Sequence, residues 1–461
     1  MIIESYVYSV RIIILSAAFA LISMLSIAQD QHNVELLGHW FREDLPINYR
    51  NARFSEVFAV VNDGVEYAVI ASTMGAHFVE IPDETFPTLT EVEFIPGTFQ
   101  GFGVNHRDYD VLDNYLFAVA DQAPALLQIV DFSLLPDTAM IVYESDEFFS
   151  TAHNIRMDQD NRRAYVCGPS GHAMCILDVD DPENPVLLAH FDLVPYVHDC
   201  YVRDHVAWLN CGNQGLFVFD FTDPLLPVLL GTLEDYPEQG YNHQGWLNDA
   251  GDTYAFTDET EGLEMKVCDV SDLTDIQVLD TFSSESDTTA IPHNLYIIDD
   301  MIFVSHYGDG LQVYNFSNPN DVKRVAWYDT SEEPNVCCNG MWGVYPFLPS
   351  GRIVASDRQN GLFVFRVDLD DPTTENQHVA VGPNPGHGIV SLDFFEQSSQ
   401  GVEITCFDAT GKLCAKFIWN AQEPIQNRTE LDLSFLSDGF YTLTFIGDEF
   451  NQSVNYMKIS K

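Results

Sequence analysis

A stretch of about twenty residues recurs along this chain. Copies starting at Gly75 and Ala123 are weaker, and a half copy covers 361–372. Together these make seven copies spaced by about 45 residues, which indicates a repeat architecture in which each unit buries its apolar face against the next. The four clearest copies are "GHAMCILDVDDPENPVLLAHFD" (171–192), "GLFVFDFTDPLLPVLLGTLED" (215–235), "GLEMKVCDVSDLTDIQVLDTF" (262–282) and "GLQVYNFSNPNDVKRVAWYD" (310–329).

Each copy has the pattern of consecutive β-strands. A glycine opens an alternating run such as "LFVFDF", which predicts a strand. An Asp or Asn then precedes a proline-containing turn, where the acid bonds turn amides and proline presets φ. A further strand such as "VLLGTL" follows, and two more, such as "HDCYV" and "HVAWLNC", come before the glycine. Four strands per repeat without helical periodicity predict a propeller blade.

The two ends of the repeat region complement each other. The segment "NVELLGHWFRED" (33–44) resembles the last strand of a blade, and the seventh copy lacks that strand. We therefore predict an all-β fold over 33–371, a seven-bladed β-propeller closed by an N-terminal strand that leaves no free edge. Residues 372–387 form a polar, Pro/Gly-rich linker. Residues 388–461 alternate as a small C-terminal β-sandwich.

The N-terminal segment predicts export. Arg11 precedes a run of about 17 mostly apolar residues, and "SIA" lies before Gln29. Residues 1–28 are therefore predicted to be a signal peptide cleaved after Ala28; an uncleaved anchor is the alternative, but the run is short for a span. No second apolar run approaches membrane length, so the mature protein should lack a transmembrane span. A net charge of −50 argues against nucleic acid as a partner.

Export also permits disulfides. The nine cysteines are an odd number, so at least one cannot pair within the chain. Two pairs occupy hairpin-like frames and are candidate bridges, Cys200 with Cys211 and Cys406 with Cys414. No spacing matches a zinc site built from paired CxxC motifs.

The C-terminal residues resemble the sorting domain of the type IX secretion pathway. The resemblance rests on Asn384–Pro385, on the hairpin residues Asp408 and Gly411, on the strand "LSDGFY" and on the basic end "YMKISK". It implies that residues 388–461 contact the secretion machinery. It further implies passage from the periplasm through the outer membrane, followed by release or attachment at the cell surface.

The repeats themselves resemble the LVIVD-repeat propellers called choice-of-anchor B proteins. The frames "LLQIVDFS", "MCILDVDDPENP" and "LFVFDFTDP" carry this resemblance. It implies the propeller fold and an extracellular destination. No activity is established for that family, so the chemistry must be read from the residues.

A histidine recurs at the start of the first strand in five of the repeats. In a propeller this strand is innermost, so its first residues should surround one mouth of the central channel. The equivalent positions in the other two blades lie near Ser55 or Glu56 and near Met341 or Trp342. We predict a ligand site at that mouth formed by His106, His153, His198, His243, His293 and Trp342.

Two interpretations of these histidines stay open. Neutral imidazoles suit Zn²⁺, with His153, His198, His243 and Asp258 as the proposed ligands, and Asp121 or Asp357 able to orient the rings. Alternatively, each histidine bonds the backbone of the next blade and keeps the ring in register. Ca²⁺ is a further option at 108–114 and 158–161, although both stretches lack the glycine and terminal glutamate of a full calcium loop.

Other chemistry is sparse. The sequence has no GxSxG, HExxH, P-loop or dinucleotide-binding motif. The aromatic residues Trp246 and Tyr296 could stack on sugars or could fill wedges between blades. We therefore predict an exported module that binds an extracellular glycan or protein. The alternatives are a metal-dependent hydrolase or lyase acting at the channel mouth, or a purely structural adhesin.

Overall fold

The structure is a computed structural model, and it contains two compact units, within Asp30–Glu375 and Asn376–Lys461. The predicted signal peptide and its cleavage site after Ala28 lie outside the described residues. Among the residues that are described, no helix is both long and apolar enough to cross a membrane. The structure describes 31–122, 124–284, 289–331, 338–369, 379–382, 388–394, 402–408, 412–419, 428–437, 439–447 and 451–458.

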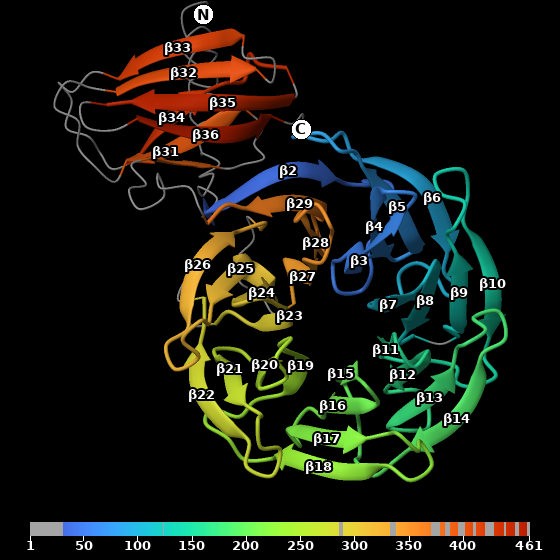
Figure 1. The fold of residues 1–461 in the computed structure, drawn as a ribbon. Coiled ribbons are helices and arrows are strands. Elements are labelled where there is room, and N and C mark those ends of the chain that lie inside the picture. Colours follow the sequence, from blue (N-terminus) through green and yellow to red (C-terminus); the bar gives the residue numbers. More distant parts are fainter. Residues whose placement is uncertain are drawn as a thin grey trace, which may run out of the picture. The chain divides into compact units, whose positions relative to one another are not determined.

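The larger unit is a seven-bladed β-propeller, as predicted (Figure 1). Each blade is an antiparallel sheet whose strands follow one another from the centre outwards. The first three blades are β3 (Phe54–Asn62), β4 (Val65–Ser72), β5 (Gly75–Ile81) and β6 (Thr90–Pro96); β7 (Arg107–Leu112), β8 (Tyr115–Ala120), β9 (Leu127–Asp131) and β10 (Met140–Ser145); and β11 (Asn154–Asp158), β12 (Arg163–Cys167), β13 (Met174–Asp178) and β14 (Val186–Phe191).

The remaining blades continue around the ring. The short helix η1 (Tyr307–Asp309) joins two strands of the sixth blade. These blades are β15 (Asp199–Arg203), β16 (Val206–Asn210), β17 (Leu216–Asp220) and β18 (Val228–Leu233); β19 (Asn242–Leu247), β20 (Thr253–Asp258), β21 (Met265–Asp269) and β22 (Gln277–Phe282); β23 (Pro292–Ile298), β24 (Met301–His306), β25 (Gly310–Asn315) and β26 (Lys323–Tyr328); and β27 (Met341–Tyr345), β28 (Ile353–Asp357) and β29 (Gly361–Val367) with β2 (Val34–Trp40).

The N-terminal strand closes the ring, which confirms the prediction from the chain ends. Strand β2 pairs antiparallel with β29, from Val34 opposite Val367 to Trp40 opposite Leu362. The preceding strand β1 (Gln31–His32) pairs with β26 of the neighbouring blade. The first described residues therefore connect the sixth and seventh blades, and β29 is not left as an unpaired edge strand.

The turn chemistry expected from the repeats is present in each clear copy. Asp220 Oδ1 accepts a hydrogen bond of 2.7 Å from the amide of Thr222, and Asp178 Oδ1 accepts one of 2.9 Å from the amide of Asp180. Such side-chain bonds stabilise the turn before the outer strand. Aliphatic and aromatic side chains pack between neighbouring blades, so the core consists of a series of wedges.

The smaller unit contains two sheets, which confirms the C-terminal sandwich. Residues 379–382 differ from prediction, because they lie in the predicted linker 372–387 but form a strand that pairs with residues 391–394. Val379 and Val381 are buried there, so their alternation is that of a strand. The sheets are β30 (Val379–Gly382), β31 (Ile389–Phe394) and β34 (Arg428–Asp432), and β33 (Leu413–Trp419), β32 (Val402–Asp408), β35 (Gly439–Ile446) and β36 (Asn451–Lys458).

Neither predicted disulfide, Cys200 with Cys211 or Cys406 with Cys414, is formed in the structure. Strand register explains the error. Cys406 lies opposite Ala415, and Cys200 lies opposite Leu209, so the predicted partners Cys414 and Cys211 are offset along the strand. The Cys200 thiol instead lies 3.5 Å from the thiol of Cys167 in the adjacent blade.

Candidate functional site

The innermost strands of the seven blades surround the centre of the propeller (Figure 1). Their residues form three successive levels. The histidine level consists of the five predicted histidines and Trp342. The polar level begins one or two residues later along each strand, and the aromatic level lies about three residues after the histidine level.

At the histidine level, six side chains form a closed circle. Ring centroids are 4.8 Å apart for His106 and His153, 4.1 Å for His153 and His198, and 4.2 Å for His198 and His243. His293 follows at 4.4 Å from His243. Trp342 completes the circle, at 4.3 Å from His293 and 5.3 Å from His106. The structure thus brings together all six residues that the sequence predicted for this site.

Three of these histidines bond the backbone of the next blade. His106 donates from Nε2 to the carbonyl of His153 over 2.9 Å, and His198 donates from Nδ1 to the carbonyl of His243 over 3.0 Å. His293 Nδ1 donates to the carbonyl of Trp342 over 2.6 Å. This pattern is the one that the register interpretation expects.

The other two histidines face carboxylates. His153 Nδ1 lies 2.9 Å from Asp121 Oδ2, and His243 Nε2 lies 3.7 Å from Glu259 Oε2. Burial lowers the pKa of both His106 and His243 to about 3, and brings the pKa of His198 well below its usual value. Burial also lowers the pKa of His153, but the hydrogen bond and charge of Asp121 outweigh it and raise that pKa. His153 is therefore the most readily protonated member of the circle.

Asp258, the predicted carboxylate ligand, does not face the histidines. Its Oδ2 accepts a hydrogen bond of 2.7 Å from Lys266 Nζ and its Oδ1 accepts one of 2.8 Å from Tyr236. Successive side chains of a strand point to opposite faces, and the next residue, Glu259, is the one that approaches His243. The third predicted carboxylate, Asp357, bonds Thr330 Oγ1 at 2.8 Å.

The polar level is buried and joins neighbouring blades, and it also joins the first blade to the sixth. Glu56 accepts a hydrogen bond of 2.9 Å from Asn294, and Asp199 accepts one of 2.8 Å from Asn154. Gly343 has no side chain because Glu56 occupies the space: a Cβ there would lie 2.1 Å from Glu56 Oε1. These contacts separate the histidine level from the aromatic level.

One guanidinium lies among several carboxylates at the polar level. Arg156 Nη2 is 3.3 Å from Asp199 Oδ2, and both side chains are buried. Burial raises the pKa of Glu56 to about 7 and that of Asp110 to about 6. It also raises the pKa of Asp108 well above its usual value, with Arg156 opposing the shift. The group therefore holds more acid than its single arginine neutralises.

This acid group predicts a pH-dependent stability. Folding raises the pKa of Glu56 from 4.5 to about 7. The contribution of this carboxyl group to the free energy of unfolding is therefore complete below pH 4.5, the pKa in the unfolded chain, and is lost as the pH rises through 7. A Glu56→Gln chain should gain on the order of 2 kcal/mol in unfolding free energy relative to wild type between pH 5 and pH 8. Urea unfolding at both pH values measures this difference.

The matched control for that experiment is Glu43→Gln at an exposed position. Like Glu56→Gln, it removes one negative charge from the chain, but it leaves the polar level unchanged. An equal pH response in both variants would assign the effect to net charge and contradict the buried origin.

The two stretches considered for Ca²⁺ lie in strand β7 and at the end of strand β11. Asp108 and Asp110 lie within strand β7, where each accepts a backbone amide of the adjacent blade, from Ile155 and Met157. Asp158 accepts hydrogen bonds from the side chain of Asn161.

At the aromatic level the structure reveals a pocket that the sequence interpretation missed. Its volume is about 320 Å³. The charged residues that line it include Asp110, Arg156, Asp160, Arg203 and Asp204. This volume lies at the lower end of the range of ligand pockets. Its aromatic residues are Phe58, Tyr201, Trp246, Tyr296, Tyr345 and Phe347.

The aromatic side chains of this pocket form a continuous wall. Trp246 lies 4.6 Å from Tyr201 and 4.8 Å from Tyr296, both in edge-to-face geometry. Phe347 lies 5.4 Å from both Tyr296 and Tyr345 and is partly exposed. The sequence does contain a signal for this wall. Five of its aromatic residues each lie three positions after the residue at the start of the first strand of a blade, namely Ser55, His198, His243, His293 or Trp342; they are Phe58, Tyr201, Trp246, Tyr296 and Tyr345.

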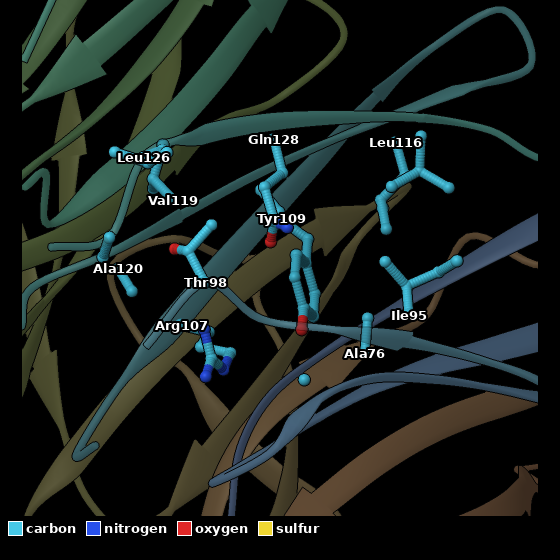
Figure 2. Close-up of a pocket in the computed structure, with 14 residues that line it drawn as sticks. Ala76, Ile95, Thr98, Arg107, Tyr109, Leu116, Val119, Ala120, Leu126 and Gln128 are labelled. Atoms are coloured by element: carbon cyan, nitrogen blue, oxygen red, sulfur yellow. The ribbon is translucent and has the colours of Figure 1, made fainter. Parts of the chain in front are cut away.

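A smaller cavity lies between the first two blades (Figure 2). Its volume of about 10 Å³ is room for about one water molecule. Arg107 and Tyr109 line it, and the hydroxyl of Tyr109 has no hydrogen-bond partner among the described residues. This cavity is too small for an organic ligand.

Comparison with known proteins identifies the C-terminal unit. Residues 380–458 match the family described as the secretion system C-terminal sorting domain. No curated protein sequence matches the chain.

Solved structures of propellers resemble the chain in fold. The WD40 repeats of RRP9 are 10% identical, with a TM-score of 0.51, and the match covers 74% of this chain and 99% of that one. The periplasmic gluconolactonase PpgL of Pseudomonas aeruginosa is 9% identical, with a TM-score of 0.50, over 82% of this chain and 96% of that one. At these identities the likeness shows the fold alone. The chain is a secreted or cell-surface β-propeller that carries a type IX secretion sorting domain.

Proposed function

We propose that this propeller is an extracellular binding module of the choice-of-anchor B type, and that its ligand occupies the aromatic pocket. The observation that carries the proposal is the wall of six aromatic side chains around a volume of about 320 Å³. Such a wall supplies a rigid apolar surface, and its tyrosine and tryptophan edges add polar groups.

The ligand that fits best carries a cationic group, such as a basic side chain of an extracellular protein. Aromatic faces attract ammonium and guanidinium groups. The pocket lining contains Asp110, Asp158, Asp160 and Asp204 but only two arginines, and one of these, Arg156, already pairs with Asp199. The chain's net charge of −50 further favours a cationic partner.

Export would follow two signals in this proposal. Residues 1–28 would direct the chain to the periplasm with cleavage after Ala28, which the small residues before Gln29 support. The sorting domain would then engage the type IX machinery, which the family match over 380–458 supports.

A binding titration tests the pocket. Calorimetry with a short oligolysine peptide should show saturable binding to the wild-type chain. Phe347→Ala should weaken it about tenfold, because the partly exposed ring belongs to the wall and closely neighbours three other aromatic rings. Asp204→Asn should weaken binding and reduce its salt dependence. Asn suits that position, where φ is 54°.

The control is Phe102→Ala, an exposed aromatic residue outside the pocket. Its affinity should equal that of wild type. A neutral oligosaccharide bound equally well at all salt concentrations would overturn the cationic assignment in favour of a glycan. Equal oligolysine affinities for wild type and Phe347→Ala would overturn the pocket as the site.

A further inference from the structure

We propose that His198, His243 and Glu259 form a binding site for one divalent transition-metal ion, with Zn²⁺ as the ion that their donors suit. One potential ligand atom of each residue lies within 4.8 Å of those of the other two. The site belongs to the histidine level, at the other end of the innermost strands from the aromatic pocket. It therefore stands independently of the proposed ligand.

The first ligand, His198, has a defined tautomer. Its Nδ1 donates to the carbonyl of His243 over 3.0 Å, so the ring proton is on Nδ1 and the lone pair is on Nε2. Metal-bound histidines commonly donate their second nitrogen to such a carbonyl, which orients the ring. The side chain is also buried, so its orientation is well constrained.

The second ligand, His243, has its Nε2 directed at Glu259. The distance from Nε2 to Glu259 Oε2 is 3.7 Å, which is too long for a hydrogen bond. It is close to the separation of about 3.3 Å that two ligands adopt around a tetrahedral Zn²⁺ with bonds of about 2.0 Å. The spacing therefore suits two donors to one ion better than it suits a direct bond between them.

The third ligand, Glu259, is oriented by a tyrosine. The hydroxyl of Tyr307 donates to Glu259 Oε1 over 2.5 Å, which leaves Oε2 on the side of His243. Tyr307 itself is held in the ring of aromatic contacts, at 5.0 Å from His293 and 5.9 Å from Trp342. The hydrogen bond from His198 to the carbonyl of His243 and the hydrogen bond from Tyr307 to Glu259 thus leave His198 Nε2 and Glu259 Oε2 available to the same ion.

The remaining histidines are not part of this set. His106 and His293 use one ring nitrogen each on a neighbouring carbonyl, and His153 pairs with Asp121. The site therefore contains two imidazoles and one carboxylate, and the widest pair must approach by about 1.5 Å through side-chain rotation. Three protein ligands leave the fourth position of Zn²⁺ for water or an external ligand.

Equilibrium dialysis against Zn²⁺ tests the site, using the full chain purified without a polyhistidine tag and treated with chelator. Elemental analysis should find one Zn²⁺ per chain at saturation. Tyr307→Phe should weaken binding about tenfold, because it removes only the contact that orients Glu259. Glu259→Gln should weaken Zn²⁺ binding more, because this variant loses a ligand. When Co²⁺ is added in place of Zn²⁺, the wild-type chain should show visible absorption and Glu259→Gln should not.

A second histidine cluster provides the matched control. His172 and His190 stack at 3.7 Å, and His172 lies 2.8 Å from Asp192 on the exposed surface. His172→Gln should leave the stoichiometry and affinity unchanged. Loss of Zn²⁺ in His172→Gln, or full affinity in Glu259→Gln, would overturn the assignment.

The folding of each variant is checked by near-ultraviolet circular dichroism. Glu259 is partly exposed, with 24% of its side chain accessible, so Glu259→Gln should fold and can decide the question. A wild-type chain that binds no Zn²⁺ would also overturn the proposal. The oligolysine titration uses variants of Phe347 and Asp204 in the aromatic pocket, so the failure of one proposal does not decide the other.

Discussion

A chain that begins at Phe41 should fail to form a stable propeller, whereas one that begins at Asn33 should fold. The longer chain retains β2, which pairs with β29 and buries Leu36 and Leu37. Losing these side chains and Val34 removes about 5–9 kcal/mol of burial free energy. That amount is comparable to the total stability of a domain. The truncation also leaves β29 as an unpaired edge prone to association.

Thermal unfolding and size-exclusion chromatography measure this effect. The chain beginning at Asn33 should unfold in one cooperative transition and elute as a monomer. It lacks only β1, whose two residues add to β26. Equal transition temperatures for the two chains would show that β2 does not close the ring.

Arg156→Met should destabilise the propeller by about 3–5 kcal/mol, because it leaves buried carboxylates without their counter-ion. Asp199 lies 3.3 Å from the guanidinium, and Arg156 opposes the raised pKa values of Asp108 and Glu56. The effect should be smaller at pH 5 than at pH 8, since protonation neutralises the raised carboxyls. Urea unfolding at both pH values measures it.

Arg203→Met is the control for this substitution. Arg203 is only partly buried, and its Nη1 donates to the carbonyl of Asn248 over 3.2 Å. Its loss should cost less than about 1 kcal/mol. The double variant Arg156→Met/Asp199→Asn should recover part of the loss, because it removes one stranded charge. A loss below about 1 kcal/mol for Arg156→Met would refute the role of this ion pair.

Local signals were sufficient for the architecture and for the histidine circle. The alternating runs, the acid before each turn and the unmatched strands at the chain ends are short-range features, and the structure realises them as strands, turns and ring closure. His198 and its equivalents occupy one frame in the repeat, so their placement at one level follows from the register of the innermost strands.

The same signals were insufficient for the contacts between strands. Asp258 and Glu259 are adjacent acids, and the sequence did not show which of them faces His243. The offset of Cys211 from Cys200 and the pairing of β30 likewise depend on register between strands. A change of one residue in register reverses the face on which a side chain lies.

The sequence alone therefore determined a closed seven-bladed propeller, its C-terminal sandwich and the common level of five histidines, because each depends on local patterns repeated along the chain. Only the tertiary structure decided that Glu259 joins His198 and His243, and that aromatic residues of five blades enclose one pocket. The physical reason is that closure of the ring sets the distances between residues of different blades. His198 is 45 positions from His243 and 61 from Glu259, and no local pattern encodes the distances between residues so far apart.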